Sequence, residues 1–453
     1  MKKPRYARLA DMLANAIQDG KLVPGSKLPT HRAFAEKSGV ALATATRVYK
    51  ELEQRGLVAG EAGRGTFVRD PGLPVTLGVH QTAAEGVTDL VFNMPGDAAD
   101  AGMLRSGLRR LATAGDLEAM LRYQPHGGRL HERRIIAESL APGLGRVDPE
   151  CLLVTSGSQH SLAVTCLGLF RYGDLIAADT LTYPGFKSAA ALRGLNLLPV
   201  EGSQGVMDPD ELERLCRLRE VRAVYLMPTV HSPLGSVMDE ATRRRLLDVA
   251  QRNDLLIIED AAYAFLEQNP PPSFYSLAPD RTVHIGGFSK NLATGLRLGY
   301  VIAPASQTLP LLEAIRATTW NAPALISGLV AGWIEDGTLQ VSEENRRRDG
   351  AARQSVLRKV FGTLPLQSHP NAGFAWMPLE KGVRAQPIVT RLKEHGLSVS
   401  GAEPFATTTA APQALRLAFG GIPKTELEGV LNTVRDAVCI DQAGYGQDPA
   451  IRK

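Results

Sequence analysis

Short apolar runs that alternate with helix-length segments mark the chain from about residue 89 onward. The runs are Cys151–Val154, Leu175–Ala178, Ala223–Met227, Leu255–Ile258, Thr282–Ile285 and Gly299–Ile302. This alternation is typical of a largely parallel sheet that carries helices on its faces. We therefore predict an α/β domain. Since this region is larger than one typical domain, we also expect a smaller C-terminal α+β subdomain from about residue 330.

The first 70 residues differ from the rest in charge. They contain 13 Lys and Arg against 7 Asp and Glu, whereas the whole chain contains 51 against 47. The segment therefore has a net charge of +6 and the remainder a net charge of −2. A basic segment joined to a slightly acidic body indicates a module that binds a polyanion.

The same segment has the pattern of three helices and a hairpin. Apolar residues at helical spacing define the first helix: Leu9, Met12, Leu13, Ala16 and Ile17. Gly20 ends it, Thr30 is the expected N-cap of a second helix that Gly39 ends, and a third helix runs from about Ala43 to Gln54. Two short apolar runs around a Gly-rich turn at 61–65 follow. This order predicts a winged helix-turn-helix, whose third helix enters the major groove of DNA.

Several polar side chains of this unit are suited to contacts with double-stranded DNA. The candidates are Arg32, Thr44, Thr46, Arg47, Arg64 and Gly65. Arg47 can contact a phosphate or a guanine edge, and the threonines a phosphate or a thymine methyl group. Arg64 lies between glycines at the tip of the wing, where the backbone can approach a minor groove. The alternative is a small basic bundle whose charges are only solvated.

Composition excludes several other classes of protein. No stretch approaches the ~20 apolar residues that span a bilayer, and the N-terminus lacks an apolar signal region. We therefore expect a cytoplasmic protein without a membrane partner. Its four cysteines form no pair with metal-binding spacing, so we expect reduced thiols and no metal site.

The segment GGFSKNLATGLRLGYV, residues 286–301, is the most informative part of the body. Lys290 follows an apolar strand, where its amine can form an imine with an aldehyde cofactor. Ser289 and Arg297 can bind the phosphate of the same molecule. The alternative is a surface lysine in a Gly-rich loop.

Upstream, LLIIEDAAYAFL places Asp260 and Tyr263 at the end of a buried strand, the edge where open α/β sheets bind ligands. A carboxylate that faces a pyridine nitrogen keeps that nitrogen protonated through a charge-assisted hydrogen bond. Tyr263 can reach the phenolic oxygen of the ring. The alternative for Asp260 is a helix N-cap.

Two further candidate segments precede LLIIEDAAYAFL in the chain. LLVTSGSQHSL is a strand, a turn and a helix start, so Gly157, Ser158 and Gln159 can offer backbone N–H groups to a phosphate. Tyr183, in TYPG, follows the next strand and can stack on a pyridine ring. The alternatives are an ordinary strand-to-helix turn and a plain turn residue.

The order SGSQ, TYPG, SPLG, EDAAY, SKNLATGLRLG and LRLAFG resembles the fold-type I aminotransferases that use pyridoxal 5′-phosphate, over about residues 90–440. The resemblance implies the following site: Lys290 as the covalent attachment point, Asp260 and Tyr263 on the ring, Tyr183 stacked on it, and Ser158, Gln159, Ser289 and Arg297 on the phosphate. It also implies that Tyr123 reaches the phosphate of a partner subunit and that Arg416 binds the carboxylate of an amino acid.

One position departs from that family. Ser232, in Ser-Pro-Leu-Gly, stands where these enzymes usually have an Asn that bonds the ring oxygen and often the substrate. Because Ser is shorter and cannot do both, transamination is expected to be weak. The neighbouring His231 either substitutes for the Asn or packs in the loop, and we favour packing.

The basic segment resembles the winged helix of the GntR family in its PG-x-x-LP-x-x-R-x-x-A stretch, its x-T-x-x-R-x-Y-x-x-L helix and its wing. Ala41-Leu42 replace the usual Ser-Arg. The whole chain is similar to the MocR subfamily of GntR-type transcriptional regulators. This implies a DNA-binding domain (1–70), a linker (71–88) and a cofactor-binding domain (89–445). It further implies a homodimer that senses pyridoxal phosphate or an amino-acid-like amine. The alternative is an active aminotransferase with a DNA-binding appendage.

Overall fold

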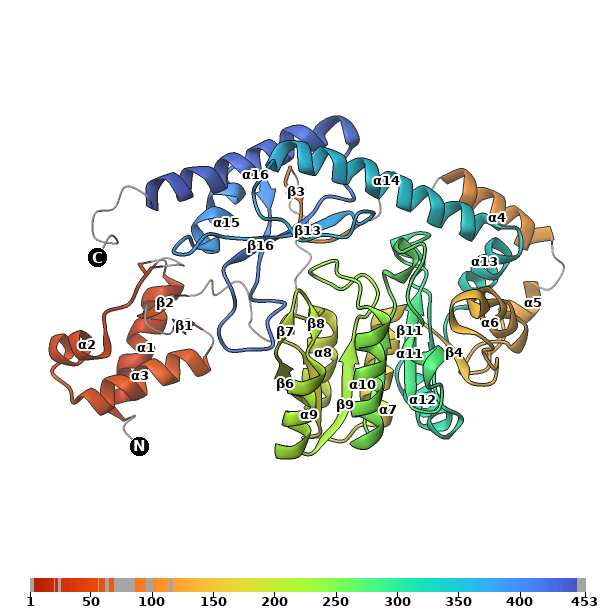
Figure 1. Cartoon of the computed structure of the whole chain (residues 1–453), viewed down its shortest axis with the longest axis horizontal. Helices are drawn as coiled ribbons and strands as arrows, with labels where there is room; N and C mark the ends of the chain where they lie inside the picture. Colours follow the sequence, from red (N-terminus) through yellow and green to blue (C-terminus); the bar gives the residue numbers. More distant parts are fainter. Residues whose placement is uncertain are drawn as a thin grey trace.

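The computed structural model describes residues 4–19, 21–22, 26–55, 57–61, 65–68, 86–94, 101–113 and 117–445. Figure 1 shows three parts: a small N-terminal unit, a large α/β unit, and a C-terminal unit above one edge of the large sheet. Residues 71–85 of the expected linker, the expected helix stop at Gly20 and the predicted DNA contact Arg64 lie outside the described residues.

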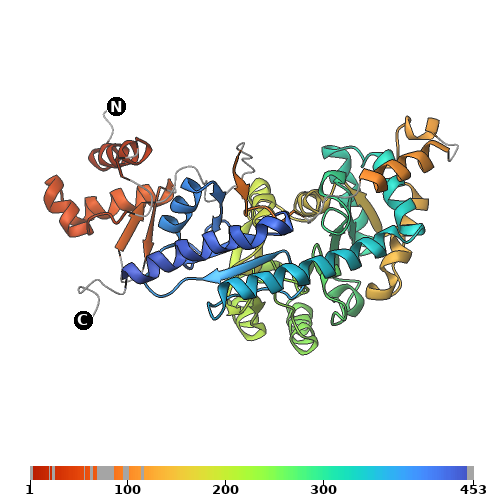
Figure 2. The same cartoon turned by 90° about the horizontal axis from the view of Figure 1, so that it is seen from above.

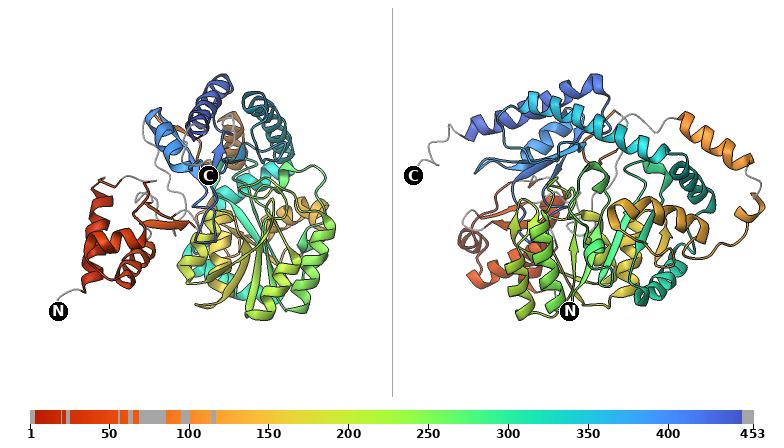
Figure 3. Two further views of the ribbon diagram at one scale, coloured as in Figure 1. Left: turned by 60° about the vertical axis from the view of Figure 1, so that its left-hand side comes forward. Right: turned by 45° about the vertical axis from the view of Figure 1, so that its right-hand side comes forward.

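The N-terminal unit is the winged helix-turn-helix that the sequence predicts. It consists of α1 (Arg5–Gln18), α2 (His31–Ser38), α3 (Leu42–Gln54), β1 (Val58–Glu61) and β2 (Gly65–Val68). Thr30 caps α2, since its Oγ1 accepts a hydrogen bond from Ala33 N, and Gly39 ends the helix with φ 59°. The inner face of α3 is fully buried, and β1 and β2 form an antiparallel hairpin. Figure 3 shows this unit beside the large α/β unit, outside its helical layers.

A seven-stranded sheet forms the centre of the large unit, in the order β4-β12-β11-β10-β9-β5-β6. Its strands are β4 (Leu152–Thr155), β5 (Leu175–Asp179), β6 (Asn196–Val200), β9 (Val221–Leu226), β10 (Leu256–Asp260), β11 (Thr282–Gly287) and β12 (Gly299–Ile302). β12 is antiparallel to β4 and β11, whereas the other neighbours are parallel. The prediction of a largely parallel sheet is therefore confirmed, and burial of both faces explains the continuous apolar runs.

Helices cover both faces of this sheet. One face carries α7 (Ser158–Leu169), α8 (Pro184–Arg193) and α12 (Ala305–Thr318). The other carries α6 (Leu130–Leu144), α9 (Pro209–Leu218), α10 (Glu240–Arg252) and α13 (Ala324–Glu335). Side chains alternate between the two layers: Tyr225 of β9 packs with α7 and α8, and its neighbour Val224 packs with α9 and α10. The polar residues at the strand ends therefore lie next to two closely packed hydrophobic layers.

The C-terminal unit is smaller and has its own core. It contains α14 (Thr338–Phe361), β13 (Phe374–Pro378), α15 (Ala385–Glu394), β14 (Leu397–Ser398), β15 (Ser400–Gly401), β16 (Ala414–Ala418) and α16 (Lys424–Tyr445). β16 is the central strand of an antiparallel sheet, and Figure 2 shows α14 and α16 extending across this unit. The short strand β3 (Thr88–Asp89) pairs with β14, and Leu90 is buried in the same core. The sequence did not predict that the chain enters this unit before it forms the large sheet.

Short elements complete the described fold: α4 (Ala101–Thr113), α5 (Leu117–Met120), β7 (Gly202–Ser203), β8 (Val206–Met207), η1 (Ala264–Leu266), α11 (Phe274–Leu277) and η2 (Thr294–Leu296). All four cysteines are free thiols. Within the described part of the chain, no helix has both the length and the apolar character needed to cross a membrane. The same residues contain no cluster of His, Cys, Asp and Glu that could hold a metal ion.

Candidate functional site

Lys290 lies just beyond the end of β11, in a pocket between the large and the C-terminal units. Its Nζ donates a hydrogen bond of 2.7 Å to the backbone oxygen of Asn93 and lies 5.8 Å from the centre of the Tyr263 ring. The side chain is partly buried and makes no ion pair with a carboxylate among the described residues. The amine is therefore held by a neutral acceptor that an incoming group can displace.

Asp260 is the last residue of β10 and is 1% exposed. Its Oδ2 accepts a hydrogen bond of 2.8 Å from the Tyr225 hydroxyl, and its Oδ1 accepts one from Ala262 N. Burial raises the pKa of this carboxyl, although the bond from Tyr225 opposes that shift. No helix begins at Asp260, so the N-cap alternative is wrong. A buried carboxylate without a cationic partner at a strand end is suited to a protonated ring nitrogen.

Tyr263 lies between the positive charges of Lys290 and Arg416. Its hydroxyl accepts a hydrogen bond of 3.2 Å from Asn93 Nδ2. Burial alone raises the pKa of this phenol, but the charges of the two cations and the hydrogen bonds to the phenol together lower it. Tyr263 can therefore share or release its proton more readily than an ordinary tyrosine.

Tyr183 and Gln159 form a pair on the other side of the pocket. The Tyr183 hydroxyl donates to Gln159 Oε1 at 3.2 Å, and Gln159 Nε2 donates to the Gly185 oxygen at 2.8 Å. Burial, and after it the charge of Asp260, raises the pKa of Tyr183. The phenol therefore stays protonated and offers a fixed aromatic face.

The predicted phosphate-binding residues converge at the N-terminus of α7. Gly157 precedes the helix with φ 95°, and a Cβ built there would lie only 2.9 Å from Arg297 Nη2. Arg297 Nη1 donates to Ser289 Oγ at 3.4 Å, and a Cβ built on Gly287 would lie 2.5 Å from Ser158 Oγ. Two hydroxyls, one guanidinium and the free N–H groups of a twelve-residue helix thus line one cradle, which suits a phosphate.

Arg416 occupies the centre of β16 and is 4% exposed. Its Nη1 donates to the Val91 oxygen at 2.8 Å, its Cζ lies 5.0 Å from the Phe374 ring, and its buried Nε has no hydrogen-bond partner. Burial lowers the pKa of this guanidinium, although the neighbouring Tyr263 opposes the shift. Among the described residues, no carboxylate forms an ion pair with Arg416, and a buried guanidinium is costly unless an anion joins it, so its surroundings fit a ligand carboxylate.

Ser232 and His231 occupy the loop after β9, and both are buried. His231 Nε2 lies 3.6 Å from Asp179 Oδ2, and its ring is close to Gly205. These contacts agree with the interpretation that His231 packs in the loop. Ser232 is buried in this loop, at the position where the related enzymes usually have Asn.

Tyr123 lies on the surface and is not part of the pocket of its own chain. It is 90% exposed, and its ring centre lies 5.9 Å from that of Trp320, which also contacts His126. Its predicted role therefore needs a second copy of the chain.

The predicted DNA contacts of the N-terminal unit lie mostly on its surface. Arg32, Thr46 and Arg47 are exposed, and Thr44 is half-buried. The Arg47 guanidinium lies 4.2 Å from the centre of the Tyr6 ring, and Thr46 Oγ1 bonds to the Leu42 oxygen. Gly65 has φ 118°, and a Cβ there would lie 2.8 Å from Lys27 Cε. Leu42, where the GntR family usually has Arg, is exposed at the start of α3.

Sequence reasoning did not identify two residues that organise this pocket. Asn93 bonds to Lys290 through its backbone and to Tyr263 through its side chain. Tyr225 holds Asp260. In the sequence, the only sign of Tyr225 is its hydroxyl group within a mostly apolar strand. Asn93 lies in a segment without helical or strand periodicity.

Comparisons with known proteins agree with this geometry. Residues 86–434 match the family Aminotransferase class I and II, and residues 5–68 match the gntR family of bacterial regulatory proteins. The chain is 29% identical to the uncharacterized HTH-type transcriptional regulator YdeF of Bacillus subtilis, over 96% of this chain and 94% of that one. It is 26% identical to the HTH-type pyridoxine biosynthesis transcriptional regulator PdxR of Corynebacterium glutamicum, over 96% of each chain.

Solved structures support the fold of the body. The crystal structure of LysN, an α-aminoadipate aminotransferase of Thermus thermophilus complexed with N-(5′-phosphopyridoxyl)-L-leucine, superposes with a TM-score of 0.72 at 24% identity. The superposition covers 79% of this chain and 94% of LysN. The body is therefore a fold-type I domain, whose cofactor is pyridoxal 5′-phosphate.

Fold and site thus define a class of protein: a winged helix-turn-helix joined to a fold-type I, pyridoxal phosphate-binding domain. The chain belongs to the class I and II aminotransferase family, and its N-terminal GntR domain gives it the architecture of the MocR-type transcriptional regulators. The resemblance inferred from the sequence is confirmed.

Proposed function

We propose that this protein is a DNA-binding transcriptional regulator whose body holds pyridoxal phosphate on Lys290 and senses that cofactor, an amino-acid-like amine, or both. The observation that carries the proposal is the combination of a GntR domain with a pocket in which Lys290, Asp260, Tyr263 and Arg416 are all present. Regulators named as such, related over almost the whole chain, support it. Action on DNA also supports a location in the cytoplasm.

The proposed roles in the pocket follow from the contacts of each residue. Pyridoxal phosphate supplies an aldehyde that condenses with primary amines and a ring that withdraws electrons. Asp260 keeps a proton on a ring nitrogen, Tyr263 donates to the ring oxygen, and Tyr183 supports the ring face. The phosphate-binding set is Gly157, Ser158, Gln159, Ser289 and Arg297.

Arg416 is the proposed anchor for the carboxylate of an amine effector. Its cost of burial favours a state in which an anion is bound. A ligand shifts a conformational equilibrium only through its different affinities for the two states. Arg416 lies in the C-terminal unit and Lys290 in the large unit. An effector that binds Arg416 and takes the place of Lys290 on the cofactor would therefore have different affinities for arrangements in which the two units are differently placed.

DNA contacts are proposed for Arg32, Thr44, Thr46, Arg47, Arg64 and Gly65. The exposure of Arg32 and Arg47 supports this. A homodimer is proposed as the working form, since the exposed ring of Tyr123 is available to a second copy. Paired helix-turn-helix units read half-sites about one helical turn, or a multiple of it, apart.

The second candidate function is an active aminotransferase, which the presence of Lys290, Asp260, Tyr263 and Arg416 favours. Ser232 argues against it as the main role. Steady-state turnover with an amino donor and 2-oxoglutarate separates the two. A rate within about 1–10³ s⁻¹, the range of ordinary enzymes, contradicts the proposal of a regulator.

The experiment that tests the proposal combines both units. Purified protein is expected to show a visible absorption band that Lys290→Ala removes. The wild-type protein is also expected to retard the DNA upstream of its own gene in a mobility-shift assay. Absence of the band or of the shift contradicts the corresponding half of the proposal.

A further inference from the structure

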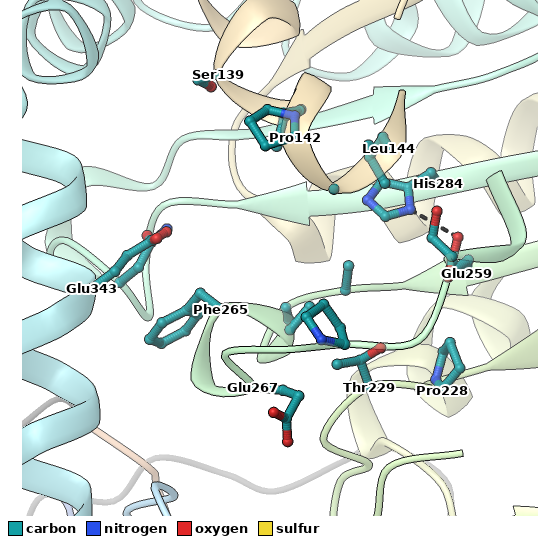
Figure 4. Close-up of a pocket in the computed structure, with 18 of the residues that line it drawn as sticks. Ser139, Pro142, Leu144, Pro228, Thr229, Glu259, Phe265, Glu267, His284 and Glu343 are labelled. Carbon is teal, nitrogen blue, oxygen red and sulfur yellow. Dashed lines mark hydrogen bonds and ion pairs between the residues drawn. The ribbon is translucent and has the colours of Figure 1, made fainter. Parts of the chain in front are cut away.

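A second cavity lies on the side of the sheet opposite α7 and α8. Its volume is about 1110 Å³, and its walls come from α6, the segment after β10, the strand β11 and the N-terminal half of α14. Figure 4 shows it between Glu343 on α14 and the buried Glu259–His284 pair. Lys290, Tyr183 and Arg416 do not line this cavity, whereas Asp260 does, so the cavity adjoins the site described above.

Most carboxylates along this cavity already have strong partners. Glu259 accepts hydrogen bonds from His284 Nδ1 and from the backbone of α11. Glu267 accepts one from His369 Nε2 at 3.1 Å, and Asp260 is held by Tyr225. Glu259 and Glu267 are therefore each paired with a histidine, whereas Asp260 has neutral donors and belongs to the cofactor site.

Glu343 differs from Glu259 and Glu267 in its partner. Its Oε1 accepts a hydrogen bond of 2.8 Å from Asn291 Nδ2, a neutral donor. Within the described residues, no Lys, Arg or His nitrogen lies in ion-pair distance of this carboxylate. The nearby Arg347 donates to the Phe265 oxygen at 2.8 Å. Burial raises the pKa of Glu343, although the bond from Asn291 and the charge of Arg347 oppose that shift.

Asn291 provides an independent observation. Its Nδ2 faces the Glu343 carboxylate, which fixes the orientation of the amide, and its Oδ1 has no hydrogen-bond partner among the described residues. The residue is 7% exposed and lines the cavity. Two acceptors thus adjoin the cavity: the Glu343 carboxylate, whose donor is neutral, and the Asn291 oxygen, which has no donor among the described residues.

The remaining wall defines the rest of a ligand. Phe265 supplies apolar surface near Glu343, and Pro270–Pro272 and Leu144 add further apolar wall, with Leu144 nearer His284 (Figure 4). Apolar surface next to a carboxylate matches an organic cation, whose carbon chain can pack against it. We propose that this cavity binds an aliphatic amine, with its ammonium group on Glu343 and Asn291 and its chain against Phe265 and the prolines.

The position of the cavity gives the ligand a route to the cofactor site. Asn291 directly follows Lys290 in the chain, and Ser342 Oγ donates to the backbone oxygen of Asn291. α14, which carries Glu343 and Ser342, leads directly into the C-terminal unit. An amine on Glu343 therefore contacts the two segments between which the cofactor pocket lies.

Isothermal titration of the full-length holoprotein tests the proposal. The probe is N,N,N′,N′-tetramethyl-1,4-butanediamine, whose tertiary nitrogens are protonated but cannot condense with an aldehyde. Binding at this cavity is therefore distinguishable from chemistry at Lys290, and failure of either proposal leaves the other intact. We expect Glu343→Gln to weaken binding about tenfold, since a charge-assisted contact is lost.

Two further variants complete the design. Glu344→Gln is the matched control, because Glu344 is the next residue of α14 and is exposed, so wild-type affinity is expected. Gln340→Glu adds a carboxylate to the cavity wall one helical turn away and is expected to tighten binding, a gain that misfolding cannot produce. Equal affinity in wild type, Glu343→Gln and Gln340→Glu, or no binding at millimolar probe, overturns the proposal.

Discussion

The two functional regions of this protein differ most in the burial of their charged residues. In the winged helix-turn-helix, Arg32 and Arg47 are exposed to solvent. In the cofactor pocket, Asp260 and Arg416 are almost fully buried. Exposed charges are screened by salt and act together, whereas a buried charge interacts strongly with a few neighbours. DNA binding is therefore spread over many weak contacts, and cofactor and effector binding depend on single residues.

Lys290 is the sharpest test of that contrast, because one substitution is expected to abolish cofactor retention. Lys290→Ala removes the only amine placed beside Asn93 and Tyr263 among the described residues. The visible absorption band and the cofactor retained after gel filtration are expected to disappear. Lys359→Ala, at an exposed ion pair with Glu428, is the control and is expected to retain both. Full retention in Lys290→Ala contradicts the assignment.

Arg416 is expected to give the next largest effect. L-alanine and ethylamine differ by one carboxylate, so spectroscopic titration of both measures what Arg416 contributes. Wild type is expected to bind alanine at least about tenfold more tightly than ethylamine, and Arg416→Met to remove the difference, since a bond to a charged group contributes about 1.5–3 kcal/mol. The thermal midpoint of the ligand-free variant is expected not to fall, because Met replaces an unpaired buried charge. If Arg416→Met still binds alanine more tightly than ethylamine by the wild-type factor, another group binds the carboxylate.

Glu259 and Asp260 sharpen the comparison within the body, since they are adjacent and equally buried but their pKa values shift in opposite directions. Burial raises the pKa of Asp260, so the folded chain binds its proton more readily than the unfolded chain, and stability falls as pH rises through that window. Glu259 is also desolvated, but His284 and two backbone N–H groups lower its pKa, so its contribution is lost as pH falls.

In the cofactor-free protein at neutral pH, Asp260→Asn is therefore expected to raise the free energy of unfolding and Glu259→Gln to lower it, each by about 1–3 kcal/mol. Thermal unfolding as a function of pH measures both. A shift of the same sign in the two variants contradicts the assigned environments.

Arg47 is expected to have the smallest effect of this set. Arg47→Ala removes one of several exposed cations, so affinity should fall about tenfold or less on any sequence, and the salt dependence of binding should decrease by about one unit of slope. Fluorescence anisotropy on labelled DNA at several salt concentrations measures both. Lys37→Ala, at the far end of α2, is the matched control. A loss confined to one DNA sequence instead assigns Arg47 to a base.

The same contrast explains what the sequence could predict. Buried strands read as apolar runs, so a polar residue at their ends, such as Asp260 or Lys290, is conspicuous and its position follows from the topology. In the winged helix, Thr30 and Gly39 marked α2 through local capping chemistry. These predictions needed only nearby residues and the general geometry of parallel sheets.

Contacts between distant segments could not be predicted in this way. Asn93 and Lys290 are 197 residues apart, and their bond depends on how the C-terminal unit lies over the sheet. The pairing of β3 with β14 has the same origin. The half-buried Glu343 is ordinary in the sequence of α14 and becomes unusual only because it forms no ion pair within the described part of the fold.

The central claim is that the body controls the winged helix. Its most direct test is the affinity of wild type and Lys290→Ala for the DNA upstream of the gene, measured with and without pyridoxal phosphate. The account predicts that the cofactor changes the affinity of the wild type and leaves that of Lys290→Ala unchanged. Four equal dissociation constants would contradict it, because the two units would then bind their ligands independently.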